Sequence, residues 1–235
     1  WSVRPRAHRV VRLHPEPGRV RAVGCAADGS VEAMHRHPIE HLRVVEDDPQ
    51  LLASLPQWYG ASMSATLASP RVEAVAWDPG RAVARGGPWD LVLLLDGDPT
   101  TLRRNRTRTL EFFESCRSHM SADGILVLRV GVPDTYLGGA GGRLLAILAA
   151  TLGRVFEQVA VIPGPEVLLV AGGPTAALSL EPAVLSGRLA ARGTEQEELM
   201  REMIPLLVDP ARARDLAGLL DPDAPLNTVR HPRAV

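Results

Sequence analysis

The sequence predicts an α/β fold with a seven-stranded, mostly parallel sheet that ends in an antiparallel hairpin. The run at residues 91–95 is apolar throughout, which is typical of a strand buried on both sides of a parallel sheet. Upstream of this run, apolar strand-like segments alternate with helical segments, an order that favours parallel βα units. Downstream, the strand-like segments 155–162 and 166–171 are separated only by Pro163, Gly164 and Pro165, so we expect them to pair as a hairpin.

The composition favours one large domain without a strong electrostatic signature. A chain of 235 residues is long enough to bury a core, and its net charge of −1 gives no basic field for nucleic acid. The two cysteines, Cys25 and Cys116, lie far apart without metal-ligand spacing, so we expect buried thiols, no metal site and a cytoplasmic protein. No apolar run reaches the roughly 20 residues of a membrane span. Association with a membrane would therefore depend on segments absent from this sequence.

The amino-terminal part predicts a turn suited to a nucleotide. Residues 1–18, rich in arginine, histidine and proline, are expected to form an extension, or an edge strand at the alternating residues 9–13. A strand at residues 20–23, a turn from Gly24 to Gly29 and a helix over about residues 30–36 follow. This is how a Rossmann-like fold holds a nucleotide, because glycine lets the backbone approach the ligand closely. Gly24 and Gly29 are therefore candidate cofactor-binding residues, with a purely structural turn as the alternative.

Acidic residues follow the next three predicted strands. Glu46 ends the strand at residues 41–45, where an acid can accept hydrogen bonds from ribose hydroxyls. Asp78 follows the strand at residues 71–76 and precedes a proline, so it is a candidate ligand residue and also a candidate helix N-cap. Asp96 and Asp98 follow the strand at residues 91–95, in a turn that we expect to be exposed, before a helix that extends to about residue 119. Because open α/β sheets bind ligands at the carboxyl ends of their strands, these two acids are candidates for holding a cation or acting as a base.

The remaining segments complete the predicted architecture. A strand at residues 124–130 is followed by a glycine-rich joint at 138–142, a helix to about residue 152 and the hairpin. Apolar periodicity then predicts helices at 182–191, 195–208 and 210–220. We expect residues 19–175 to form a Rossmann-like domain of the class I S-adenosylmethionine-dependent methyltransferase type, with the helical residues 176–235 packed on the same domain.

Residues 89–113, WDLVLLLDGDPTTLRRNRTRTLEFF, resemble the spermidine synthase family. In that family a buried strand is followed by Asp-x-x-Asp-Pro and by Glu-Phe-Phe or Glu-Phe-Tyr. The match is strongest to relatives fused to membrane segments, whose pattern is roughly DLPDPTTLQLNRLYTREFF. Two further segments are similar to these relatives: GVPDTYLG at residues 131–138 to their GSPDTYLG, and LNTVRHP at residues 226–232 to their LNTDLRP.

The resemblance implies an enzyme that transfers an aminopropyl group from decarboxylated S-adenosylmethionine to a diamine or polyamine. It implies cofactor-binding roles for the turn glycines Gly24 and Gly29 and for the acids Glu46 and Asp78. It also places Asp98 at the second acid of the motif, which contacts the substrate amine. The first acid, the base, falls on Leu95, so Asp96 serves as a base only if the turn has rearranged.

Other positions depart from the family pattern as well. The family's turn is GGGDGG, whereas here Cys25, Ala26 and Asp28 stand at glycine positions. We expect the added side chains to narrow the nucleotide groove. Arg129 replaces a glutamine that faces the substrate in the family, and a positive charge there would repel a polyamine.

Three functions therefore remain open. The altered turn and the displaced acid favour a non-catalytic or weakly active relative that serves binding or assembly, as a homodimer or as the cytosolic part of a membrane protein. The second is an active aminopropyltransferase that uses Asp96 or Asp98. The third is a methyltransferase that uses S-adenosylmethionine, although no Asn-Pro-Pro-Tyr-like amine site is present.

Overall fold

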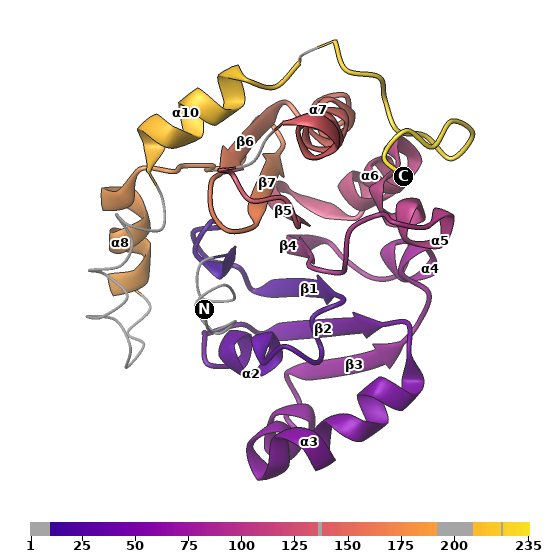
Figure 1. Ribbon diagram of the computed structural model, residues 1–235. Helices are drawn as coiled ribbons and strands as arrows, with labels where there is room; N and C mark the ends of the chain where they lie inside the picture. Colours follow the sequence, from indigo (N-terminus) through magenta and orange to yellow (C-terminus); the bar gives the residue numbers. More distant parts are fainter. Residues whose placement is uncertain (1–9, 136–137, 192–208, 222) are drawn as a thin grey trace.

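A single seven-stranded sheet forms the centre of the computed structural model, which describes residues 10–135, 138–191, 209–221 and 223–235 (Figure 1). The strands lie in the order β3-β2-β1-β4-β5-β7-β6. Their bounds are β1 (Arg19–Val23), β2 (His41–Glu46), β3 (Val72–Ala76), β4 (Trp89–Leu94), β5 (Met120–Val130), β6 (Gln158–Ile162) and β7 (Val167–Gly172). Strands β1 to β5 pair in parallel, and β7 is antiparallel to both β5 and β6. The predicted parallel sheet with a terminal antiparallel hairpin is confirmed.

Helices cover both faces of this sheet. Side chains of α2 (Ser30–His35), α3 (Pro49–Leu67) and α8 (Pro182–Ala190) pack in the core on one face. Those of α4 (Pro79–Val83), α6 (Leu110–Ser118), α7 (Gly139–Gly153) and α10 (Pro210–Gly218) pack in the core on the other face. No helix among the described residues is both long and apolar enough to cross a bilayer.

The alternating side chains of each central strand explain why its sequence is apolar throughout. In β4, Leu91 and Leu93 belong to the core under α2 and α3, whereas Val92 and Leu94 belong to the core under α6 and α7. All four are at most 1% exposed. Since successive strand residues point to opposite faces, burial of both faces leaves no place for a polar residue.

Two sequence-based expectations about local structure are wrong. At residues 10–13 there is no edge strand: Val10 and Val11 are helical and a turn follows. Val10, Val11 and Leu13 are all buried in one core, which a surface strand with alternating faces would not allow. The helix expected to continue to residue 119 is instead divided into α5 (Leu102–Asn105), a 3-10 turn η1 (Arg106–Arg108) and α6. Thr109 causes the division, because its backbone is extended and its hydroxyl caps α6 by accepting from the Phe112 N–H.

The carboxyl-terminal helices are observed where the structure describes them. The helices predicted at 182–191 and 210–220 correspond to α8 and α10. Leu185 of α8 and Leu216 of α10 are buried in the cores on opposite faces of the sheet. The helix predicted at 195–208 lies outside the described residues.

Candidate active site

The candidate residues lie along one edge of the sheet because their strands are adjacent and parallel. Gly24 follows β1, Glu46 ends β2, Asp78 follows β3, and Asp96 and Asp98 follow β4. These four strands are neighbours in the order β3-β2-β1-β4, so their carboxyl ends meet at the same edge. This is where open α/β folds bind ligands.

The turn after β1 approaches the end of β4 very closely. Gly24 has a φ of +69°, and a Cβ placed on it would lie 2.3 Å from the Cβ of Asp96. Glycine is therefore required here by the fold itself, whatever the turn binds. Gly29 has a φ of +78°, but a Cβ on it would meet no atom within 4 Å, so the space above the start of α2 is open.

The substituted residues of the turn are accommodated by the fold. Cys25 and Ala26 are at most 1% exposed and belong to the hydrophobic core. Contrary to our expectation, their side chains therefore do not narrow the nucleotide groove. Asp28 accepts a hydrogen bond from the Ser30 N–H (2.9 Å) at the start of α2. Tyr59 of α3, which sequence analysis did not select, donates its hydroxyl to the carbonyl of Ala27. The two residues lie 32 positions apart, and no sequence signal joins them.

Glu46 is a half-buried carboxyl group at the end of β2. Burial raises its pKa, and the nearby carboxylates of Asp47 and Asp96 raise it further, against a hydrogen bond from the Asp47 N–H (3.1 Å) to its Oε1. The next acid, Asp48, has a structural role, since its Oδ1 caps α3 by accepting from the Gln50 and Leu51 N–H groups.

Asp78 has the N-cap role that its position before proline predicted. Its Oδ1 accepts from the Arg81 N–H at 3.1 Å at the start of α4. Its Oδ2 lies 3.6 Å from Nη1 of Arg106, with both side chains substantially exposed. A ligand that used this carboxylate would compete with Arg106.

Asp96 is not the free, exposed acid that we expected from the turn sequence. Its side chain is only 20% exposed, and its Oδ1 accepts from Nη2 of Arg108 at 2.8 Å. Its Oδ2 accepts from the Thr107 hydroxyl at 3.1 Å. Arg108 is fully buried and also donates to the Thr107 hydroxyl and carbonyl. Leu95, at the position of the family's base, is 2% exposed and packs in the core.

Arginines of one short segment pair with the acids along this edge. We call residues 102–108, which form α5 and η1, the arginine segment. Arg103 pairs with Asp47 beyond β2 (2.8 Å), Arg106 with Asp78 beyond β3 (3.6 Å) and Arg108 with Asp96 beyond β4 (2.8 Å). Figure 1 shows α5 beside α4, at the end of the sheet to which β1, β2 and β3 point. The edge is therefore acidic in sequence but largely charge-compensated in structure.

Asp98 differs from its neighbours because the described part of the chain places no arginine on it. Its Oδ1 accepts from the Gly131 N–H at 2.8 Å. A Cβ on Gly131 would lie 2.4 Å from the Asp98 Oδ2, so a larger residue at this position would displace the carboxylate. Arg129, which we expected to repel a polyamine, lies 3.3 Å from Oε1 of Glu166, and this partner offsets its charge.

Hydrogen bonds from the carboxyl-terminal tail hold the arginine segment in place. Asn227, within the LNTVRHP motif, is fully buried, and its Nδ2 donates to Oδ1 of Asn105 (2.9 Å) and to the carbonyl of Arg108 (2.8 Å). Its carbonyl accepts from the Leu110 N–H, and its Oδ1 accepts from the Arg233 N–H. The motif stands out in the sequence only by resemblance, and its residues give no sign of this structural role.

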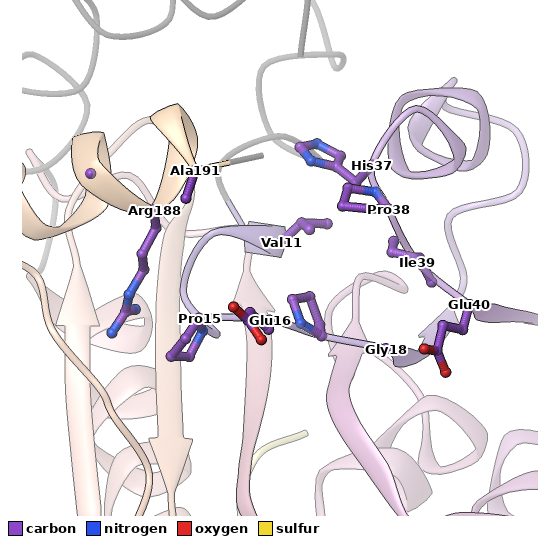
Figure 2. Close-up of a pocket in the computed structure, with 12 residues that line it drawn as sticks. Val11, Pro15, Glu16, Gly18, His37, Pro38, Ile39, Glu40, Arg188 and Ala191 are labelled. Carbon is purple, nitrogen blue, oxygen red and sulfur yellow. The ribbon is translucent and has the colours of Figure 1, made fainter. Parts of the chain in front are cut away.

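A cavity at the opposite edge of the sheet is separate from this site. It has a volume of about 560 Å³ and lies beside Gly18, which precedes β1. Figure 2 shows Arg188 of α8 on one side and residues 37–39 on the other. The guanidinium of Arg188 donates to the carbonyls of Arg12, Leu13 and Ala177, so it links α8 to residues 12–13 and to the segment that follows β7.

Comparison with known proteins finds an aminopropyltransferase in sequence, and spermidine synthases and methyltransferases in structure. No family profile matches the chain. A polyamine aminopropyltransferase of Desulforudis audaxviator is 28% identical over 128 residues, which are 54% of this chain and 46% of that protein. The matched region thus spans about half the length of the curated relative.

Solved structures extend the likeness of fold to almost the whole chain. A spermidine synthase in complex with the transition-state analogue AdoDATO has a TM-score of 0.72 at 18% identity, covering 93% of this chain and 75% of that one. The spermidine synthase of Thermotoga maritima has a TM-score of 0.67 at 16% identity, with coverage of 93% and 74%. Human methyltransferase-like protein 13 in complex with SAH has a TM-score of 0.60 at 20% identity, with coverage of 86% and 90%. The fold is thus the Rossmann-like class I methyltransferase fold, as predicted.

Proposed function

We propose that this chain, which is spermidine synthase-like in sequence and fold, retains a nucleoside-binding cleft but has lost aminopropyl transfer. Its role is then binding or assembly, as a homodimer or as the cytosolic part of a membrane protein of the kind that its motifs resemble. The observation that carries the proposal is the ion pair between Asp96 and the buried Arg108.

Aminopropyl transfer needs a carboxylate that can reach an attacking ammonium and take its proton. Leu95 has no proton acceptor and is buried in the core. Both oxygens of Asp96 already accept hydrogen bonds, from Arg108 and from Thr107. A cationic substrate that approached Asp96 would therefore have to displace a guanidinium that has no exposed surface.

The nucleoside end of the cleft fits a ligand better. Glu46 is half-buried at the end of β2, where its carboxyl group can accept hydrogen bonds from ribose hydroxyls. The space above Gly29 is open, and Cys25 and Ala26 leave it so. Asp78 would receive the adenine amino group in place of Arg106. Decarboxylated S-adenosylmethionine or S-adenosylmethionine would supply the electrophilic carbon beside its sulfonium, as the ligands named for the neighbouring structures suggest.

An active aminopropyltransferase is the alternative, and Asp98 is the observation in its favour. It follows the same strand, and the described residues offer it no arginine partner. In that case Asp98 would both hold the acceptor amine and accept its proton.

Titration calorimetry and a product assay together test the proposal. We expect decarboxylated S-adenosylmethionine and methylthioadenosine to bind to the wild type. Glu46→Gln should weaken both by about tenfold, the usual effect of removing a charge-assisted hydrogen bond. Asp48→Asn is the matched control, since Asp48 caps α3. With putrescine or spermidine present we expect no methylthioadenosine to form. Turnover that is lost in Asp98→Asn would support the alternative instead, and absence of nucleoside binding would overturn both.

A further inference from the structure

Basic side chains gather on one face of the sheet, away from the carboxyl edge that holds the candidate site. In the amino-terminal halves of β1 and β2, the register places Arg19 beside His41 and Arg21 beside Arg43. Because alternate residues of a strand share a face, these four side chains lie on the same face. Arg85, in the loop that follows α4, joins them, since its carbonyl accepts from the guanidinium groups of Arg21 and Arg43. We call these five residues the basic face.

Three guanidinium groups of the basic face surround one indole ring. The Cζ atoms of Arg21, Arg43 and Arg19 lie 4.4, 5.0 and 5.2 Å from the ring centroid of Trp89, which is fully buried. A tryptophan ring attracts a cation over its face. Three like charges around a single ring also repel one another, and an anion bound between them would relieve that repulsion.

The acids beside the basic face offset only part of its charge. Glu73 accepts from Nε of Arg43 at 2.8 Å and lies 3.3 Å from Nε2 of His41. Asp90 accepts from the backbone N–H of Arg19 at 2.8 Å. Burial lowers the pKa of His41, and the charges of Arg19 and Arg43 lower it further, against the effect of Glu73. Four guanidinium groups thus lie beside two carboxylates, which leaves an excess of two positive charges among the described residues.

Three of these arginines have donors that a ligand can reach. Arg19 is half-buried, and its two terminal nitrogens reach the surface without an acceptor among the described residues, although its Nε is buried. The Arg43 side chain is 13% exposed; its Nε and Nη1 donate to Glu73 and to the Arg85 carbonyl, which leaves its Nη2 for a ligand. Arg85 is exposed and stacks 4.9 Å from the ring centroid of Trp77, with no acid paired to it in the described part of the chain.

We propose that the basic face binds the phosphate group of a small, soluble phosphate monoester. Its oxygens accept from the terminal nitrogens of Arg19 and from Nη2 of Arg43, and Arg85 adds its charge. The fork of N–H donors on a guanidinium matches the oxygens of a phosphate. A phosphate dianion also matches the excess of two positive charges, whereas a carboxylate would offset only half of it. This site shares no residue with the nucleoside cleft, so either proposal can fail without the other.

NMR titration with glycerol phosphate tests the inference, at pH 8 and constant ionic strength, with acetate as the monoanionic probe. The ester is a dianion at this pH. We expect it to produce saturable shifts of the Trp89 indole N–H and of the backbone amides of residues 19–21 and 41–43. Acetate should bind at least about tenfold more weakly, because it lacks one charge and one pair of charge-assisted hydrogen bonds.

Arg19→Gln removes a charge that has no carboxylate partner, so glycerol phosphate should bind at least about tenfold more weakly. Arg36→Gln is the matched control, because Arg36 is an exposed arginine at the end of α2, which packs on the other face of the sheet. It should change the affinity less than about threefold. If Arg19→Gln fails to fold, Arg85→Gln replaces it, since that side chain is exposed, and it should weaken binding by more than about threefold.

Co-sedimentation with vesicles of phosphatidylcholine and phosphatidate distinguishes a soluble ester from a lipid headgroup. We expect no sedimentation, because the half-buried donors of Arg19 and Arg43 lie too deep for a flat membrane surface. Sedimentation that Arg19→Gln abolishes would overturn the soluble ligand in favour of a lipid. Shifts that do not saturate, equal affinities for acetate and glycerol phosphate, or an unchanged affinity in a folded Arg19→Gln protein would each overturn the site itself.

Discussion

Replacing Asp96 with asparagine should destabilise the protein, because the change leaves the buried guanidinium of Arg108 without its counter-charge. Arg108 is 1% exposed and its Nη2 lies 2.8 Å from Oδ1 of Asp96. Removing one partner of a buried ion pair costs about 3–5 kcal/mol. Asparagine keeps one oxygen that can accept from Arg108, so we expect a loss of about 3 kcal/mol, at the lower end of that range. From the sequence alone, an acid in an exposed turn would have been expected to contribute less than about 1 kcal/mol.

Thermal unfolding followed by circular dichroism measures this loss. For a chain of this size about 3 kcal/mol corresponds to a fall in the melting temperature of about 6–12 °C. Asp98→Asn is the matched control, since Asp98 follows the same strand but accepts from the backbone N–H of Gly131 instead of a buried guanidinium. We expect it to shift the melting temperature by less than about 3 °C.

A double-mutant cycle with Arg108→Met then isolates the pair. We expect the double variant to be more stable than the sum of the single changes predicts, by about 1–3 kcal/mol. If Asp96→Asn melts like the wild type and the stability changes of Asp96→Asn and Arg108→Met are additive, Asp96 does not pair with Arg108. The argument that Asp96 cannot act as the base then fails.

Asn227→Ala should lower the free energy of unfolding by about 2–4 kcal/mol, because it leaves Asn105 and the Arg108 carbonyl without a buried donor. Thr228→Ala is the control in the same thermal assay. Equal melting temperatures of the two variants would contradict the claim that Asn227 holds the arginine segment. Cys116 is buried and its pKa is raised by burial to about 12, so Ellman's reagent at pH 8 should react with it only after denaturation. Rapid labelling of Cys116 in the native protein would show that the core around α6 is accessible to the reagent. Burial raises the pKa of Glu46, so the native state holds this proton more tightly than the unfolded state and stability falls as pH rises from the unfolded pKa through the folded one. Glu46→Gln should therefore flatten the decline in melting temperature over that window, and parallel pH profiles would show that Glu46 titrates normally.

The fold follows from local features of the sequence. The continuous apolar run at residues 91–95 requires burial on both faces, and the spacing of strands and helices leaves few other topologies. The hairpin at Pro163-Gly164-Pro165 is likewise a local signal. The break at Thr109 was missed because a threonine within an amphipathic segment is compatible with both a helix interior and an N-cap.

The state of the site depends on contacts that no local pattern reveals. Arginine side chains are usually exposed to solvent. Arg108 is buried nevertheless, because Asp96, 12 positions earlier, is close enough to pair with it. Asn227 reaches Asn105 across 122 positions, and Tyr59 reaches Ala27 across 32. The acids along the edge are therefore predictable from the sequence, but which of them are already paired is not.

A single ¹H NMR experiment tests most directly the claim that the protein binds the nucleoside without aminopropyl transfer. Decarboxylated S-adenosylmethionine is mixed with the protein and excess putrescine, and the resonances of the nucleoside are followed with time. If the cleft binds the nucleoside without transferring the aminopropyl group, those resonances broaden on addition of the protein, sharpen again with Glu46→Gln, and do not change into those of methylthioadenosine. The appearance of methylthioadenosine at a rate proportional to protein concentration, or resonances that the protein leaves unchanged, would contradict the account.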